Sequence, residues 1–274
     1  MKPYYRVPIC DCGEPLVDIP WVESLADWGH PPQSQSGSGL PVLPVLPVNQ
    51  GLDQPPGVQL SQFRVVQPHP YQGLGAPYGD QSPYKLRSGV LAALTQAQAV
   101  LQQHYPHWGL QIFDAYRPLA VQKFMVEYTF QQLLQERQLS AKNLSTEQRR
   151  DIMELVMQFW AMPSDRPETP PPHSTGAAID LTLVDSSGTP VAMGSAIDEV
   201  SPRSFPNYYS RSDHPQAELF DHHRQLLNHV MTAAGFRRHP QEWWHFSLGD
   251  QLWAWLISQE SGEGTPLAYY GRVA

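Results

Sequence analysis

An apolar run that contains a single carboxylate places the strongest constraint on the fold of this 274-residue chain. Residues 177–184 read Ala-Ala-Ile-Asp-Leu-Thr-Leu-Val and come directly before the turn-forming residues 185–188, a pattern typical of a buried strand. Strand periodicity puts Asp180 on one face with Ala178 and Thr182. The opposite face, which we expect to enter a core, carries Ile179, Leu181 and Leu183. A carboxylate buried in such a run needs a partner.

His173 lies shortly before this strand and is the first candidate partner for Asp180. Histidine and aspartate both ligate zinc, so the pair could hold a metal ion. A simple hydrogen-bonded pair explains the same two residues. Gly176 and Ala177 leave room for another group to approach the first face of the strand.

A second pair of chemically active residues, Glu242 and His245, flanks two tryptophans near the C-terminus. This spacing puts both side chains on one face of a helix but on opposite faces of a flat strand. If the pair serves one site, we expect a turn or bulge just after Glu242 and a final strand that opens at His245. Alternatively, the segment is an aromatic core strand between a surface glutamate and a capped histidine.

Arg117 follows a strand predicted for residues 108–116 and precedes a helix predicted to begin at Pro118. Alternation puts Leu110, Ile112 and Asp114 on one side and Phe113, Ala115 and Arg117 on the other. Catalytic side chains are often presented at such junctions. An Arg–Asp pair that pins the junction is the structural alternative.

The remaining periodicities predict helices that alternate irregularly with strands. The helices begin at Ser88, Pro118, Ser145 (with Gln148 in a capping box) and Gln216, and the last ends at Gly235. A hairpin is expected to pair 181–184 with 189–193, and a short strand is expected at 59–66. This order favours an α+β fold, with a small, mainly antiparallel sheet and packed helices.

Several other segments have weaker signals. The loop 69–84 carries Tyr71, Tyr78 and Tyr84, which either wall a pocket or pack on the surface. His222, His223 and His229 fall mostly off the apolar stripe of their helix, so we expect them to be solvated. Cys10 and Cys12 are too close together to form a disulfide easily, and we interpret them as reduced thiols.

The composition divides the chain into three parts. Many of the 28 prolines lie in an N-terminal arm, residues 1–58, which includes three Leu-Pro-Val units at 40–48. Proline denies residues 31–58 both helix and central strand, so we expect this run to be disordered or to extend along the surface, where its apolar side chains could dock onto the domain. Residues 59–260 form the predicted catalytic domain and 261–274 a loose tail.

Charge and hydropathy exclude some partners. The formal net charge of -8 argues against nucleic acid, and no apolar run approaches the length of a transmembrane helix. The first residues lack the apolar core of a secretory signal, which makes a cytoplasmic location the default expectation. No pattern indicates an oligomeric state.

Four motifs together resemble the D-alanyl-D-alanine dipeptidases, the VanX-type zinc peptidases, which are related to zinc D-Ala-D-Ala carboxypeptidases and to the Hedgehog signalling domain. They are Asp-Ala-Tyr-Arg-Pro at 114–118, His-Ser-Thr-Gly-Ala-Ala-Ile-Asp-Leu-Thr-Leu at 173–183, Met-Gly-Ser-Ala-Ile-Asp at 193–198 and Glu-Trp-Trp-His at 242–245. The resemblance covers about 60–250, with the motifs in the same order and at similar spacings.

The resemblance implies a Hedgehog/DD-peptidase-like fold, one Zn²⁺ per chain and a small dipeptide substrate. It implies that His173, Asp180 and His245 are the zinc ligands and that Glu242 is the general base and then the acid. Arg117 would lie beside the scissile carbonyl, and Asp198 would help to hold the free amino group of the substrate.

Two residues depart from the family pattern. Ile197 replaces a usual aromatic residue, and Pro171 replaces a serine that contacts the dipeptide, which leaves the strictness of the D-Ala-D-Ala preference open. The alternatives are a zinc carboxypeptidase or endopeptidase acting on cell-wall peptides and a non-catalytic, zinc-stabilised binding module.

Overall fold

A computed structural model describes residues 2–22, 63–262, 264 and 267–273. Its centre is a five-stranded sheet in the order β2-β4-β5-β7-β6, in which only the β2–β4 pair is parallel. The strands are β2 (Arg64–Val65), β4 (Gly109–Asp114), β5 (Ala178–Val184), β6 (Arg237–Arg238) and β7 (His245–Ser247). A separate antiparallel pair joins β1 (Leu16–Asp18) to β3 (Lys85–Arg87). The predicted α+β fold with a mainly antiparallel sheet is therefore confirmed.

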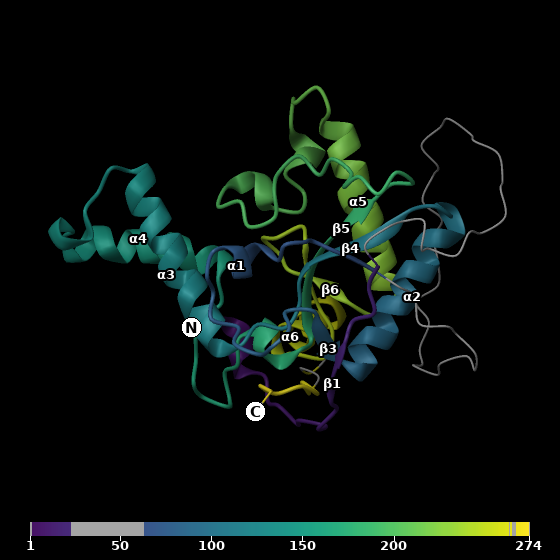
Figure 1. Ribbon diagram of the computed structural model, residues 1–274, viewed down its shortest axis with the longest axis horizontal. Coiled ribbons are helices and arrows are strands. Elements are labelled where there is room, and N and C mark those ends of the chain that lie inside the picture. Colours follow the sequence, from purple (N-terminus) through teal and green to yellow (C-terminus); the bar gives the residue numbers. More distant parts are fainter. Residues whose placement is uncertain (1, 23–62, 263, 265–266, 274) are drawn as a thin grey trace.

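Two groups of helices lie on either side of this sheet (Figure 1). One group contains α2 (Ser88–His104) and α5 (Ala217–Ala233), and the other contains α3 (Leu119–Glu136) and α4 (Thr146–Phe159). The short α1 (Pro70–Gly73) precedes them in the chain, and α6 (Gln251–Ser261) follows the last strand. Within the described ranges, no helix is both long enough and apolar enough to span a membrane.

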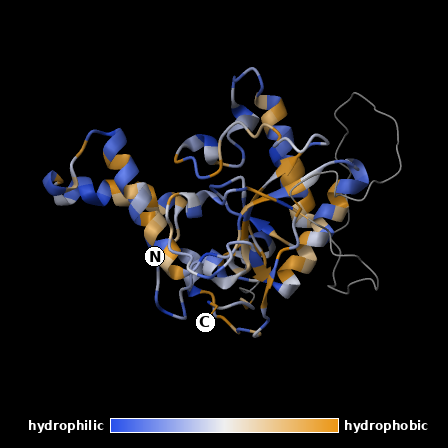
Figure 2. Cartoon of the chain, viewed as in Figure 1, coloured by the Kyte–Doolittle hydropathy of each residue, from blue (hydrophilic) through white to orange (hydrophobic). Residues whose placement is uncertain are grey.

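The main core forms between the sheet, α2 and α5, where the central strands and the adjoining part of α5 are strongly apolar (Figure 2). The predicted core face of β5, Ile179, Leu181 and Leu183, is fully buried in this core. A second cluster lies between α1, α3 and α4. The helix predictions are confirmed to within about two residues at each end, and Ser145 forms the expected capping box with Gln148.

The strand predictions need three corrections. A β-bulge shifts the register between Ile112 and Asp114, so that Asp114 faces the same side as Asp180 and not the side of Ile112. The predicted second arm of the hairpin is reduced to one bridge between Val184 and Pro190, because the chain leaves the sheet after the turn. Of the strand expected at 59–66, the described part is 63–66, and β2 is confined to two of these residues.

The described parts of the N-terminal arm and the C-terminal tail pack against the rest of the protein. Arg87 is the main link, because its buried guanidinium donates hydrogen bonds to the carbonyl oxygens of Thr175, Glu14 and Gly271. Ala268 in the tail is fully buried and forms a bridge with Ile9. Residues 267–273 thus differ from the loose tail that was expected, whereas the proline-rich run at 31–58 lies outside the described residues.

Candidate metal centre

The register of the sheet brings three polar side chains into one row. Asp180 in β5 lies opposite Asp114 in β4 and opposite His245 in β7. Residues directly opposite one another in an antiparallel pair project to the same face. The predicted turn after Glu242 is present as a bend at 243–244, and His245 opens β7 as expected.

His173 reaches this row from a 3-10 helix, Pro172–Thr175, that ends immediately before β5. Gly176 closes the helix with φ of 71°, and a side chain at that position would collide with Leu16. Nδ1 of His173 lies 2.7 Å from the carbonyl oxygen of Ala115 and must donate to it, because a carbonyl oxygen only accepts. Nε2 of His173 then carries a lone pair, and it lies 3.2 Å from Oδ2 of Asp180.

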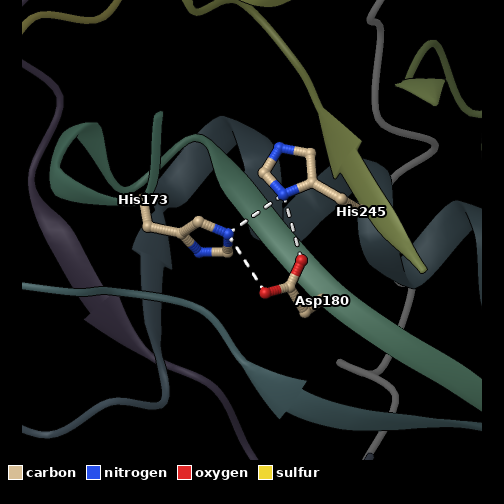
Figure 3. Close-up of side chains that lie close together, drawn as sticks. All are labelled: His173, Asp180 and His245. Carbon is tan, nitrogen blue, oxygen red and sulfur yellow. Dashed lines mark hydrogen bonds and ion pairs between the residues drawn. The ribbon is translucent and has the colours of Figure 1, made fainter. Parts of the chain in front are cut away.

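His245 presents its other ring nitrogen to the same point (Figure 3). Its Nδ1 lies 3.0 Å from Oδ1 of Asp180 and 3.1 Å from Nε2 of His173. On the far side of the ring, Nε2 lies 3.4 Å from the hydroxyl oxygen of Ser247, whose proton is donated to Asp250. The Ser247 oxygen can therefore accept from Nε2, which leaves Nδ1 of His245 as a second lone pair.

Together, His173, Asp180 and His245 form a buried set of three potential metal ligands whose donor atoms all lie within 4.8 Å of one another. Two imidazole lone pairs and a carboxylate point at one another, and none of the three groups offers a proton to the point that they share. This arrangement fits a cation. Burial raises the pKa of Asp180, but His173 and His245 in their protonated form outweigh this effect and lower its pKa overall. Two histidines and one carboxylate suit zinc, and three protein ligands leave one tetrahedral position open.

Arg117 lies behind this cluster and is almost completely buried. Its Nη2 is 2.8 Å from Oδ2 of Asp114 and 3.3 Å from Oδ2 of Asp180, and its Nη1 donates to Gln122 at 2.9 Å. The guanidinium also stacks over the rings of Tyr71 and Trp160. The bulge in β4 explains why Arg117 contacts Asp114, although alternation had placed the two on opposite sides.

Glu242 stands beside the cluster without belonging to it. Its Oε2 lies 3.7 Å from Nδ1 of His245, and its Oε1 lies 3.6 Å from Nδ1 of His239. Burial and the nearby charge of Asp180 raise the pKa of Glu242. The carboxylate is therefore placed to exchange a proton with a molecule held at the cluster.

Asp198 approaches from a loop and adopts a left-handed backbone conformation, with φ of 63°. The Tyr71 hydroxyl donates to Oδ2 of Asp198 at 2.7 Å and accepts from Nη2 of Arg117 at 3.3 Å. Burial and the charge of Asp180 raise the pKa of Asp198 to about 7. All six predicted site residues, His173, Asp180, His245, Glu242, Arg117 and Asp198, line one small pocket with a cavity volume of about 30 Å³.

Sequence reasoning missed several residues that support this pocket. Oδ1 of Asp114 accepts from Nε2 of His69 and from the hydroxyl of Tyr78, both at 3.0 Å, and Tyr71 holds Asp198. The loop 69–84 therefore supports Asp114 and Asp198 from behind: its three tyrosines are buried, but none of its residues lines the pocket, so neither of its two alternatives holds as stated. The three tyrosines indicated from the sequence that this loop could support a site, whereas nothing in the sequence linked His69 to Asp114.

The three histidines of α5 lie outside the group of potential ligands. His223 was expected to be solvated, but it is buried, and Nδ1 donates to the carbonyl oxygen of Ala192 at 2.8 Å. Phe220, on the same side of α5, widens the buried face beyond the predicted apolar stripe. His222 and His229 are partly exposed.

Comparison with known proteins identifies relatives of the whole chain. A family model described as D-ala-D-ala dipeptidase matches residues 64–261. A D-alanyl-D-alanine dipeptidase of Synechocystis sp. is 44% identical over 279 residues, which cover 100% of this chain and 97% of the relative. A protein of the same name from Escherichia coli is 46% identical over 76 residues (28% and 37% of the two chains), and one from Enterococcus faecalis is 28% identical over 163 residues (58% and 71%). By the extent of these matches, the chain belongs to the D-ala-D-ala dipeptidase family of peptidases.

Proposed function

We propose that the protein hydrolyses the D-Ala-D-Ala dipeptide to free D-alanine, with one zinc ion held by His173, Asp180 and His245. The observation that carries this proposal is the convergence of two imidazole lone pairs and a carboxylate oxygen on one buried point, with Glu242 3.7 Å from one of the ligand atoms. The names of the relatives in the three organisms support the choice of substrate.

When bound, zinc supplies a Lewis acid that polarises the scissile carbonyl and makes water more acidic. Glu242 takes a proton from the attacking water and delivers it to the leaving nitrogen as the C–N bond breaks. Arg117 lines the same pocket and stabilises the negative charge that develops on the carbonyl oxygen. A metal-ligating carboxylate must be ionised, and the lowered pKa of Asp180 meets this requirement.

Asp198 gives the pocket its preference for a free amino terminus. Its carboxylate pairs with the substrate ammonium, which an internal residue of a long peptide lacks. Tyr71 holds this carboxylate through the 2.7 Å hydrogen bond and itself accepts a hydrogen bond from Arg117. One chain of hydrogen bonds therefore connects the group that binds the substrate ammonium to the group beside the scissile carbonyl.

Hydrolysis of free D-Ala-D-Ala, compared with hydrolysis of N-acetyl-D-Ala-D-Ala, tests this function. The protein is stripped of metal with a chelator and then assayed with and without added zinc. We expect turnover of the free dipeptide only with zinc and little turnover of the blocked peptide. Preference for the blocked peptide would instead identify a carboxypeptidase or endopeptidase, and zinc binding without turnover of either would identify a binding module.

A further inference from the structure

The N-terminal segment contributes two side chains, Lys2 and Tyr4, to the wall of the catalytic pocket. The segment forms a 3-10 helix, Pro3–Arg6, whose buried tyrosines pack against Leu252 in α6. Lys2 is therefore held at the pocket by a packed element, although it lies far outside the region, 64–261, that the family model matches.

Apart from the histidines, Arg117 and Lys2 are the two basic side chains among the described residues that line this pocket. Arg117 is held by Asp114, Gln122 and the Tyr71 hydroxyl, and the proposed function already assigns it to the oxygen of the scissile carbonyl. The Lys2 ammonium makes one long hydrogen bond, 3.4 Å, to the carbonyl oxygen of Gln158, and within the described ranges it forms no ion pair. An ammonium has three donors, so Lys2 retains donors for a ligand.

The position of Lys2 matches one end of a dipeptide. Lys2 and Glu242 line the same pocket, where burial lowers the pKa of Lys2 and the charge of Glu242 raises it. Asp198 is instead held by Tyr71, beside Arg117. In a dipeptide, the carboxylate lies one carbon beyond the nitrogen that Glu242 protonates, whereas the ammonium lies on the other side of the scissile carbonyl.

We propose that Lys2 binds the C-terminal carboxylate of the substrate, so that the protein selects dipeptides with a free carboxylate. This inference rests on the proposed function, because it takes the dipeptide and the role of Glu242 from it. Lys2 and Asp198 then recognise the two opposite charges of an unblocked dipeptide. A peptide extended at its C-terminus presents an amide to Lys2 in place of a carboxylate.

The test compares D-Ala-D-Ala with D-alanyl-D-alaninamide, which differs only in the neutral C-terminal amide. Untagged, zinc-loaded protein is used, with Lys2 unchanged or replaced in Lys2→Gln and Lys2→Arg. Arg6→Gln is the matched control, because Arg6 is an exposed cation of the same 3-10 helix that does not line the catalytic pocket. Turnover is measured for all proteins, and dissociation constants are measured by calorimetry in the slow Glu242→Gln background.

We expect Lys2→Gln to weaken binding of the dipeptide by about tenfold or more, as for loss of a charge-assisted hydrogen bond, and to leave binding of the amide unchanged. Lys2→Arg should retain most of the preference for the dipeptide, and Arg6→Gln should retain all of it. Equal losses for both ligands, or no loss for either, would overturn the role of Lys2. So would a change in the pH profile of turnover without a change in the dipeptide-to-amide ratio.

These outcomes separate the two proposals. Zinc-dependent turnover of D-Ala-D-Ala by the unchanged protein, with equal affinity for dipeptide and amide, overturns only the Lys2 assignment. Dipeptide binding that depends on Lys2 but leads to no turnover overturns only the hydrolase assignment. Failure to bind either ligand overturns both.

Discussion

The carbonyl oxygen of Ala115 lies 2.7 Å from Nδ1 of His173 and so fixes the protonation of that ring. The same short segment also supplies the carboxylate of Asp114 and the guanidinium of Arg117, which bond to each other. The bulge in β4 makes this possible, because it turns Asp114 toward Asp180. One irregularity in a strand thus orients His173, the proposed metal ligand, together with the cation Arg117 and the carboxylate of Asp114 that holds it.

Removal of a ligand and removal of the proposed base should have different effects. We expect His245→Ala to lose zinc, because two donor atoms remain, and therefore to lose activity. Glu242→Ala should retain about one zinc per chain and lose at least about a hundredfold in kcat, the usual size of a general-base contribution. Metal analysis of purified protein, together with the dipeptide assay, measures both quantities.

His229→Ala is a suitable control for these variants, since His229 is partly exposed and lies outside the ligand group. It should retain both zinc and activity. Near wild-type turnover by Glu242→Ala would show that the base is assigned to the wrong residue.

Replacement of Arg117 by lysine should damage both stability and activity. Lysine keeps the charge but cannot donate to Asp114, Gln122 and Tyr71 at once, as Arg117 does. Each hydrogen bond to a charged group that lysine cannot replace costs about 1.5–3 kcal/mol of unfolding free energy, and losing a contact to the developing oxyanion costs roughly a hundredfold in kcat. Chemical denaturation and steady-state kinetics at saturating substrate separate the two effects.

Arg150→Lys provides the comparison for Arg117→Lys, because Arg150 is exposed on α4 and its ion pairs lie at the surface. That change should alter the unfolding free energy by less than about 1 kcal/mol. If Arg117→Lys unfolds at the same denaturant concentration as the unchanged protein, the ion pairs of Arg117 are not structural.

The sequence was sufficient to predict elements whose signal is local. The capping box of Ser145 and the apolar stripe of α2 depend on neighbours within a few residues, and both were predicted correctly. The alternation in β5 likewise identified its core face, because that strand has no bulge. The same alternation failed for Asp114, since no residue type in 109–116 marks where the register shifts.

Contacts between residues far apart in the chain were harder to predict from the sequence. Lys2 reaches the pocket, and Gly271 accepts a hydrogen bond from Arg87, only because both chain ends fold back over the domain. Proline-rich composition describes a segment by itself and carries no information about what it packs against. The proximity of His173, Asp180 and His245 was predicted from the resemblance of four motifs to a family, not from spacing alone.

Binding of the substrate ammonium should depend on the ionisation of Asp198. Its pKa is raised to about 7 by burial and by Asp180, while Tyr71 and Arg117 act in the opposite direction. The carboxylate is protonated below this pKa and charged above it, so affinity for the ammonium should rise as pH increases through about 7. KM for D-Ala-D-Ala should accordingly fall between pH 6 and pH 8.

Asp198→Asn is the variant that isolates this effect. It keeps an oxygen that can accept from Tyr71 but never carries the charge, so KM should be high and independent of pH over the same range. Asp213→Asn, which changes an exposed aspartate, should preserve the profile of the unchanged protein. The assignment fails if Asp198→Asn keeps the same fall in KM.

Asp250 links the stability of α6 to the orientation of His245. Its Oδ1 caps the helix by accepting from the backbone N–H of Trp253 at 2.8 Å, and its Oδ2 accepts from the Ser247 hydroxyl at 2.9 Å. Asp250→Ala should lower the unfolding free energy of the metal-free protein by about 1–2 kcal/mol through loss of the cap.

The same change frees the Ser247 hydroxyl, which can then donate toward His245 instead of accepting from it. Zinc affinity should therefore fall by about tenfold, as for other losses of a group that orients a metal ligand. Asp250→Asn keeps an acceptor oxygen and should recover much of the stability. Denaturation of metal-free protein and competition with a zinc-binding dye measure the two quantities, and a zinc affinity unchanged in Asp250→Ala would show that Ser247 does not orient His245.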